Sequence, residues 1–231
     1  MTTDVLSAIA AMAEVVSKPA EGTLSRPKQP VITISRDCGS GGDIIAERLA
    51  QRLGVPYYEQ DLLRRVAERL ETDVATARML DEGIGRAKEM WLYRLFSGQD
   101  LSPDTYRDAL ARVIMSLGRA GGVLVGRGAH VVLANACALR VRVSGTPEIC
   151  ARRLAASQGQ SEAEALAHVK DVNHHRGEFV WEMFRSRLSE ASQFDITINT
   201  DRMVDFEDVV EMLESMAKAV HRGSVLGKIA D

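Results

Sequence analysis

The sequence has few cysteines, no large excess of either charge and no long apolar run. Cys38, Cys137 and Cys150 lack the paired spacing of a disulfide framework or a metal site, which favours reduced thiols in a cytoplasmic protein. The 29 basic and 32 acidic residues leave a net charge of −3, which argues against a nucleic-acid partner held by a basic surface. No apolar run approaches the ~18 residues of a membrane span. The region around Asp4 lacks the basic segment of a secretory signal, so we expect no membrane association.

One further absence concerns a glycine-rich stretch, VITISRDCGSGGDIIA, at residues 31–46. An apolar run, a glycine turn and an apolar-periodic segment predict a strand, a loop and a helix, the geometry that directs backbone N–H groups at a phosphate. The usual loop of this kind ends G-K-[ST], and its lysine reaches the β- and γ-phosphates. Gly42 and Asp43 stand here after Gly41, so the sequence predicts a phosphate site without its lysine.

The organisation of the chain predicts one main domain that begins near Val31. Residues 17–30 hold three prolines and one glycine, so residues 1–30 are interpreted as an N-terminal extension and linker. The domain then runs over residues 31–231, and most of residues 61–119 have a helical pattern.

Five short apolar runs separated by helical segments predict a parallel five-stranded sheet with helices on both faces, an α/β fold. The last four strands are expected within residues 54–59, 121–128, 139–145 and 194–199. Ligands of such sheets bind beyond the carboxyl ends of the strands. The glycine loop after the first strand and the glycine turn that ends residues 121–128 both fall there.

Arginines near these strand ends are the candidate cations of the site. Phosphoryl transfer depends on neutralising the charge of the transferred group. Arg36 opens the glycine loop, and Arg127 lies between two glycines after a strand, where a long planar donor has little structural purpose. Arg176 lies in a long polar helical segment and ranks after Arg127, whereas Arg185 and Arg187 are expected to be solvated surface charges.

Several other interpretations of these residues stay open. The glycines can form a plain turn, or part of a dinucleotide site, although Ile44 occupies the third glycine position of that fingerprint. A helix N-terminus can lower the pKa of Cys38, but this cysteine can equally be a small loop residue. His174 and His175 point in different directions on a helix, so we expect surface side chains rather than a metal pair.

Four segments in the same order resemble the cytidylate kinases, and more closely the bacterial cytidylate kinase-like family. The first begins ITISRDCGSGGDIIAERLA, the second begins VLVGRGAHVVL, and the others are NHHRGEFVWEMF and FDITINTDRM. The resemblance implies a P-loop fold like that of nucleoside monophosphate kinases, with ATP and Mg²⁺. It also implies a helical acceptor insert at about residues 60–120 and a lid at about residues 157–190.

The same resemblance implies roles for individual residues. Arg127 would contact the acceptor nucleotide and Arg176 would close over the transferring phosphoryl group. Four residues would cradle the donor phosphates: Gly39, Ser40, Gly41 and Gly42. The chain departs from true cytidylate kinases at Gly42, at Gly128 in place of an acid, and at Asn173 in place of the lid aspartate.

Residues in and beside the loop can supply the cation and the metal ligand that these departures put in doubt. Arg36 can substitute for the lysine, because an arginine reaches a phosphate bidentately. Asp43 or Asp37 can hold Mg²⁺, although Asp43 can instead be a helix N-cap. The sequence therefore predicts transfer of the γ-phosphoryl group of ATP to a small phosphorylated acceptor, such as a nucleoside monophosphate. The alternative is a nucleotide-binding regulatory or scaffold protein with little turnover.

Overall fold

The computed structural model describes residues 7–8, 27–59, 62 and 103–223. Most of the expected acceptor insert, residues 60–61 and 63–102, lies outside the described residues, as do most of residues 1–26. The bounds of the described elements follow the chain in order: β1 Val31–Arg36, α2 Gly42–Leu53, β2 Tyr57–Tyr58, α6 Pro103–Ala120, β3 Gly122–Val125, α7 Ala129–Val132, β4 Leu139–Ser144, α8 Pro147–Gln158, α9 Glu162–Phe184, η2 Ala191–Gln193, β5 Ile196–Asn199 and α10 Glu207–Arg222.

The sheet confirms the predicted α/β fold. Its five strands are all parallel, in the order β2-β3-β1-β4-β5, with β1 at the centre. Each of the five runs identified in the sequence contains one of these strands. The central strand β1 is buried along its whole length, as expected of a strand covered on both faces.

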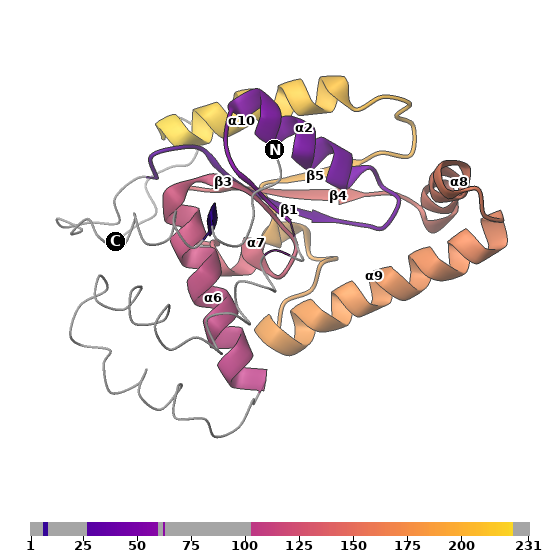
Figure 1. Cartoon of the computed structure of the whole chain (residues 1–231), viewed down its shortest axis with the longest axis horizontal. Helices are drawn as coiled ribbons and strands as arrows, with labels where there is room; N and C mark the ends of the chain where they lie inside the picture. The colour runs from indigo at the N-terminus through magenta and orange to yellow at the C-terminus, as the bar shows by residue number, and fades with distance from the viewer. Residues whose placement is uncertain (1–6, 9–26, 60–61, 63–102, 224–231) are drawn as a thin grey trace.

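Two apolar layers sandwich the sheet. Helices α2 and α10 cover one face, against a core that includes Ile32, Ile34 and Val141. Helices α6 and α7 cover the other face, against Val31, Tyr58 and Leu124. Figure 1 shows α2 and α10 together on one side of the strands and α6 and α7 on the other.

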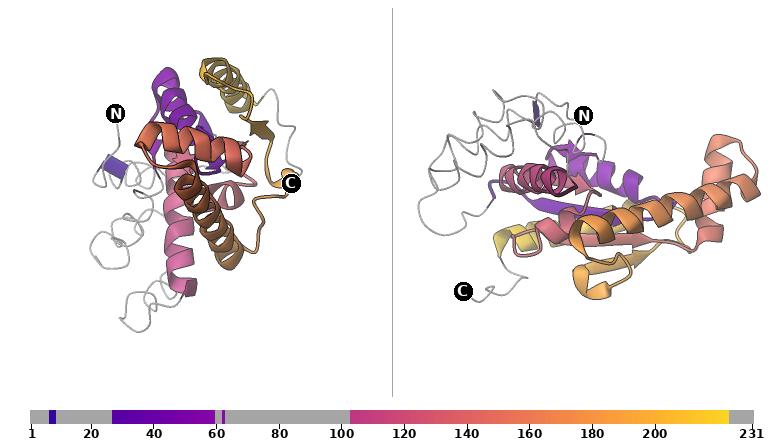
Figure 2. Two further views of the ribbon diagram at one scale, coloured as in Figure 1. Left: turned by 90° about the vertical axis from the view of Figure 1, so that its right-hand side faces the viewer. Right: turned by 90° about the horizontal axis from the view of Figure 1, so that it is seen from below.

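Helices α8 and α9 form a separate arm. A small core joins them through Cys150, Ala151, Ala165 and Val169. Figure 1 and the right-hand view of Figure 2 show the arm extending past the end of the sheet at which the loop after β1 lies. Helix α9 begins with a capping box, in which the Ser161 hydroxyl accepts from the N–H of Glu164 while the Glu164 carboxylate accepts from the N–H of Ser161. This cap fixes the start of the helix that crosses the site.

Candidate phosphate-binding site

The glycine loop joins β1 to α2 through residues 37–41. Gly39 and Gly41 have left-handed backbones, with φ of +76° and +80°. Ser40 lies between them without a positive φ, since Arg127 and Arg185 are the non-glycine residues with positive φ in the described part of the chain. A backbone that alternates in this way turns successive N–H groups toward a common concavity that suits an anion.

The hydrogen bonds of the loop separate its N–H groups into two sets. Those of Asp37, Cys38 and Ser40 bond to Val143 O, Asn173 Oδ1 and Asp37 O, at 3.0, 2.8 and 3.3 Å. Those of Gly39, Gly41 and Gly42 have no partner among the described residues. The free set lies at the N-terminal end of α2, where the helix dipole also favours negative charge. The loop can therefore hold an anion through backbone groups alone.

Ser40 supports this loop from within. Its side chain is fully buried, and its hydroxyl donates to Asp37 O at 2.8 Å. Its carbonyl accepts from the Thr200 hydroxyl at 2.9 Å. The Ser40 side chain therefore braces the loop and is directed away from a ligand, so only its backbone can take part in a phosphate cradle.

Two neighbours that are distant in the sequence, Phe206 and Arg153, lie beside the loop and its supports. A Cβ added to Gly41 would lie 2.2 Å from the ring of Phe206, which precedes α10. The Arg153 guanidinium lies 5.7 Å from the same ring and donates to Thr200 O and Met203 O. Both residues act across more than 45 positions of sequence.

Arg36 and Gly42 are matched in size. A Cβ at position 42 would lie 2.4 Å from Arg36 Cβ and 2.9 Å from Arg36 Cγ, closer than real Cβ contacts. In the usual loop, G-x-x-x-x-G-K, a glycine stands at the position of Arg36 and the lysine at that of Gly42. The two departures are therefore one exchange, in which the long cationic side chain has moved from the start of the helix to the end of β1.

Arg36 is paired with Asp43. Its Nε lies 2.8 Å from Asp43 Oδ1, with the arginine side chain 8% exposed and the aspartate 56% exposed. Asp43 is not the N-cap that the sequence left open, because Gly41 holds that position without a side-chain bond. Asp43 instead lies in the first turn of α2, where its charge complements the helix dipole.

Asp37, the other candidate for a metal, is already engaged. Its carboxylate accepts from Arg142 Nη2 at 2.5 Å and from the N–H of Gly145 at 3.4 Å. Asp43 is consequently the carboxylate of the loop that remains accessible to a cation. No group of three or more histidine, cysteine or acidic residues suited to a metal occurs among residues 27–59 and 103–223.

Helix α9 brings Arg176 to the end of β1. Arg176 Nη1 donates to Arg36 O at 3.1 Å, across 140 positions of sequence. Burial, and then the charge of Arg36, lowers the pKa of Arg176, so this guanidinium lies in a partly desolvated, cationic environment. The structure thus places Arg36, Asp43 and Arg176 around the glycine loop.

Arg127 lies at the end of the neighbouring strand, β3. Its backbone is left-handed with φ of +51°, between Gly126 and Gly128. Its guanidinium carbon stacks 4.7 Å from the ring of Phe179 on α9. Its Nε is buried, and no described residue accepts from it. A buried donor without an acceptor costs free energy, so this atom is suited to an incoming anion.

Some of the remaining interpretations of the sequence are confirmed, and one is wrong. His174 and His175 are surface side chains, 68% and 67% exposed, as expected. Burial raises the pKa of Cys38, so the lowering by the helix end that the sequence left open does not occur. Arg185 and Arg187 follow the end of α9, are exposed as expected, and stack on exposed Trp181.

Comparison with known proteins identifies the family of the chain. The model of the cytidylate kinase-like family matches residues 31–202. A crystal structure of an uncharacterized protein from Eubacterium ventriosum is 24% identical, with a TM-score of 0.61, covering 83% of this chain and 99% of that one. A shikimate kinase from Bacteroides thetaiotaomicron is 17% identical, with a TM-score of 0.46, covering 83% of this chain and 99% of that one. No curated protein matches the chain.

Proposed function

The chain belongs to the cytidylate kinase-like family, and from this premise we propose that it transfers the γ-phosphoryl group of ATP to a small phosphorylated acceptor, such as a nucleoside monophosphate. The observation that carries the proposal is the free set of N–H groups at Gly39, Gly41 and Gly42. A triphosphate bound there would meet backbone donors and the end of α2, neither of which depends on a side chain at position 42.

In this proposal Arg36 takes the part of the absent lysine. Its side chain fills the space beside Gly42, next to the free N–H groups. Asp43 neutralises it in the free protein, and would hold Mg²⁺ when the metal and triphosphate are bound, because carboxylate oxygens suit this ion. Mg²⁺ would supply charge neutralisation between the phosphates. Arg36 would contact the transferring group, together with Arg176.

Arg127 is the proposed contact for the acceptor phosphate. Its stacking on Phe179 fixes the guanidinium, and its buried Nε lacks a partner among the described residues. A carboxylate at position 128 is sterically excluded, because a Cβ there would lie 2.1 Å from the Phe184 ring. We extend the proposal to a lid at about residues 157–190 and an acceptor insert at about residues 60–120. All three cysteines are free, which fits a cytoplasmic location.

The second candidate is a nucleotide-binding regulatory or scaffold protein. The Arg36–Asp43 pair favours it, because a guanidinium held at 2.8 Å by a carboxylate is a weaker partner for phosphate. Under this alternative the triphosphate binds to the backbone N–H groups and no phosphoryl group moves.

A single-turnover assay separates the two candidates. Labelled ATP with Mg²⁺ is mixed with a panel of nucleoside monophosphates, using wild type, Arg36→Ala, Arg176→Ala and Arg127→Ala. A kinase with a relocated cation loses transfer in the first two variants. Arg127→Ala weakens acceptor binding by about 1.5–3 kcal/mol, as for a lost charged hydrogen bond, and leaves ATP binding intact. Binding of ATP without transfer to any acceptor would establish the regulatory alternative, and absence of ATP binding would reject both.

A further inference from the structure

One stripe of α9 contacts three parts of the candidate site. Asn173, Arg176 and Phe179 are spaced three residues apart, so their side chains lie close together along one side of the helix. Asn173 accepts from the N–H of Cys38, Arg176 donates to the carbonyl of Arg36, and Phe179 stacks under the Arg127 guanidinium. Loop, central strand and acceptor arginine are therefore all held by the same helix.

The Asn173 contact is selective for one N–H group of the loop. Its Oδ1 lies 2.8 Å from Cys38 N, across 135 positions of sequence. Cys38 lies immediately before the alternating residues 39–41, whose left-handed glycines turn the next N–H groups toward the concavity. Asn173 thus fixes the start of the alternation while it leaves Gly39, Gly41 and Gly42 available.

From this geometry we propose that Asn173 is a positioning residue that holds the glycine loop in its phosphate-binding conformation. The inference rests on the proposed function, because it assigns the loop a triphosphate as ligand. A carboxamide suits this position: its oxygen accepts the N–H bond without adding a negative charge beside the bound phosphates. An aspartate, which the resemblance implies at this position in true cytidylate kinases, would accept the same bond but would add a negative charge beside this loop.

The matched variants are Asn173→Ala, which removes the acceptor, and Asn173→Asp, which keeps the acceptor and adds a charge. His174→Ala is the control, because the His174 side chain is 68% exposed and contacts Glu178 on the same helix. The affinity for ATP with Mg²⁺ is measured by calorimetry at low and high salt. Thermal unfolding of each free protein reports its stability.

Asn173→Ala is expected to weaken ATP binding by about tenfold, the loss of roughly one hydrogen bond's worth of loop ordering. Asn173→Asp is expected to bind ATP weakly at low salt and to recover at high salt, because screening reduces the added repulsion. His174→Ala is expected to bind as wild type does. Wild-type affinity in Asn173→Ala would overturn the positioning role alone, whereas failure of the wild type to bind ATP would overturn both this role and the proposed function.

A second measurement reads the hydrogen bond without any nucleotide. Labelling with ¹⁵N-cysteine gives three backbone amide signals, because the chain has three cysteines. The Cys38 amide proton is expected to shift in Asn173→Ala and to stay near its wild-type position in Asn173→Asp, while Cys137 and Cys150 serve as internal references. A Cys38 signal that stays in place in Asn173→Ala would overturn the proposal, and so would equal movement of all three signals, because the effect would then not be local to the loop.

Discussion

At the scale of single residues, the exchange between Arg36 and Gly42 explains the missing lysine. A side chain at position 42 and the side chain of Arg36 would compete for the same volume, since the shortest approach is 2.4 Å between two Cβ atoms. The relief must come from the backbone or from removal of a Cβ, because neither atom is the end of a flexible chain. Gly42 is therefore a consequence of Arg36 and does not by itself indicate lost activity.

Restoring the lysine alone is expected to destabilise the protein. Gly42→Lys should lower the free energy of unfolding by about 1–3 kcal/mol, the usual cost of overpacking. The double variant Arg36→Gly, Gly42→Lys recreates the usual spacing and should recover most of this loss. Chemical denaturation of the three proteins measures the effect. Additive losses in the double variant would contradict the competition for space, because relief of the overlap requires strong non-additivity.

His130 gives a second prediction at this scale. Its side chain is almost fully buried on α7, and Nδ1 lies 3.1 Å from the Ser35 hydroxyl. Burial, and then the charges of Arg142 and Arg140, lowers the pKa of His130 to about 4. The unfolded chain binds the proton near the ordinary value of 6.5, so the folded state is fully favoured above pH 6.5 and loses this contribution as the pH falls toward 4.

Between pH 7 and pH 4.5 this histidine is expected to cost the wild type about 2 kcal/mol of unfolding free energy. The unfolding free energy of His130→Gln should fall by about 2 kcal/mol less over the same range, because glutamine does not titrate. Urea denaturation across the range measures the difference, with His174→Ala as the exposed control. Parallel pH profiles for wild type and His130→Gln would show that the buried imidazole does not cause the loss of stability at low pH.

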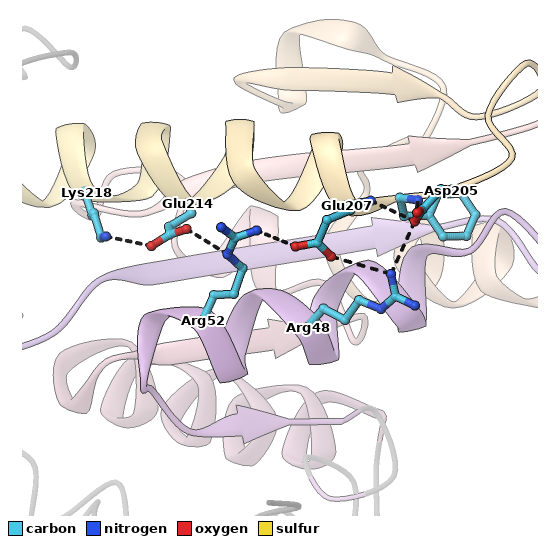
Figure 3. A network of polar contacts seen from close by, with 7 residues as sticks. Arg48, Arg52, Asp205, Glu207, Glu214 and Lys218 are labelled. Atoms are coloured by element: carbon cyan, nitrogen blue, oxygen red, sulfur yellow. Dashed lines mark hydrogen bonds and ion pairs between the residues drawn. The ribbon is translucent and has the colours of Figure 1, made fainter.

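At the scale of elements, an ion-pair network joins α2 to the start of α10. Figure 3 shows Arg52 between Glu207 and Glu214, and Arg48 between Asp205 and Glu207. Asp205 also accepts from the N–H groups of Phe206 and Glu207, which lower its pKa. The network therefore ties the helix that begins at the glycine loop to the segment that holds Phe206 against Gly41.

Arg52→Ala removes two of these ion pairs, at 2.5 and 3.0 Å. The expected loss is about 1 kcal/mol of unfolding free energy at low salt, because half-exposed pairs contribute little individually. The loss should shrink at 1 M salt, where screening acts over about 3 Å. Lys218→Ala, which removes one exposed pair to Glu214, is the control with a smaller effect. A loss that does not change with salt would mean that packing of the arginine stem, not charge, links the helices.

At the scale of the whole molecule, the N-terminal region contributes to the core as well as preceding it. Ala8 is fully buried in the cluster of α6 and α7, together with Tyr58 and Leu110. The chain then reaches β1 through Gln29 and Pro30, which lie against the start of β3. These contacts lie among the residues of the apolar core and the start of the sheet, whereas the glycine loop follows the carboxyl end of β1.

Deletion of residues 1–30 is therefore expected to lower the melting temperature while leaving the nucleotide-induced rise unchanged. The first effect follows from lost burial at Ala8, and the second because a ligand stabilises by its affinity for the folded state. A thermal-shift titration with ATP and Mg²⁺ on the truncated and full chains measures both. Ala8→Asp, which places an unpaired charge in the same cluster, should reproduce the first effect alone. A truncated, folded chain without a nucleotide-induced shift would contradict the prediction.

The strands, the parallel sheet and the position of the glycine loop could all be predicted from local sequence. Short β-branched runs such as Val31–Arg36 can be buried on both faces only as central strands, so local composition fixed the α/β fold. Parallel connection through helices then placed both glycine turns at the same edge. The loop could be located in the sequence because the left-handed backbone at Gly39 and Gly41 strongly favours glycine.

How the loop is held, and which cations lie beside it, could be seen only in the folded structure. Asn173, Thr200 and Phe206 reach the loop from more than 130 positions away, and such contacts leave no periodic signal in a single sequence. The pairing of Asp37 with Arg142, which leaves Asp43 as the accessible carboxylate, likewise depends on the register of β1 against β4. Chain topology brings these groups together, and the volume that Arg36 shares with position 42 exists only once β1 and α2 have packed.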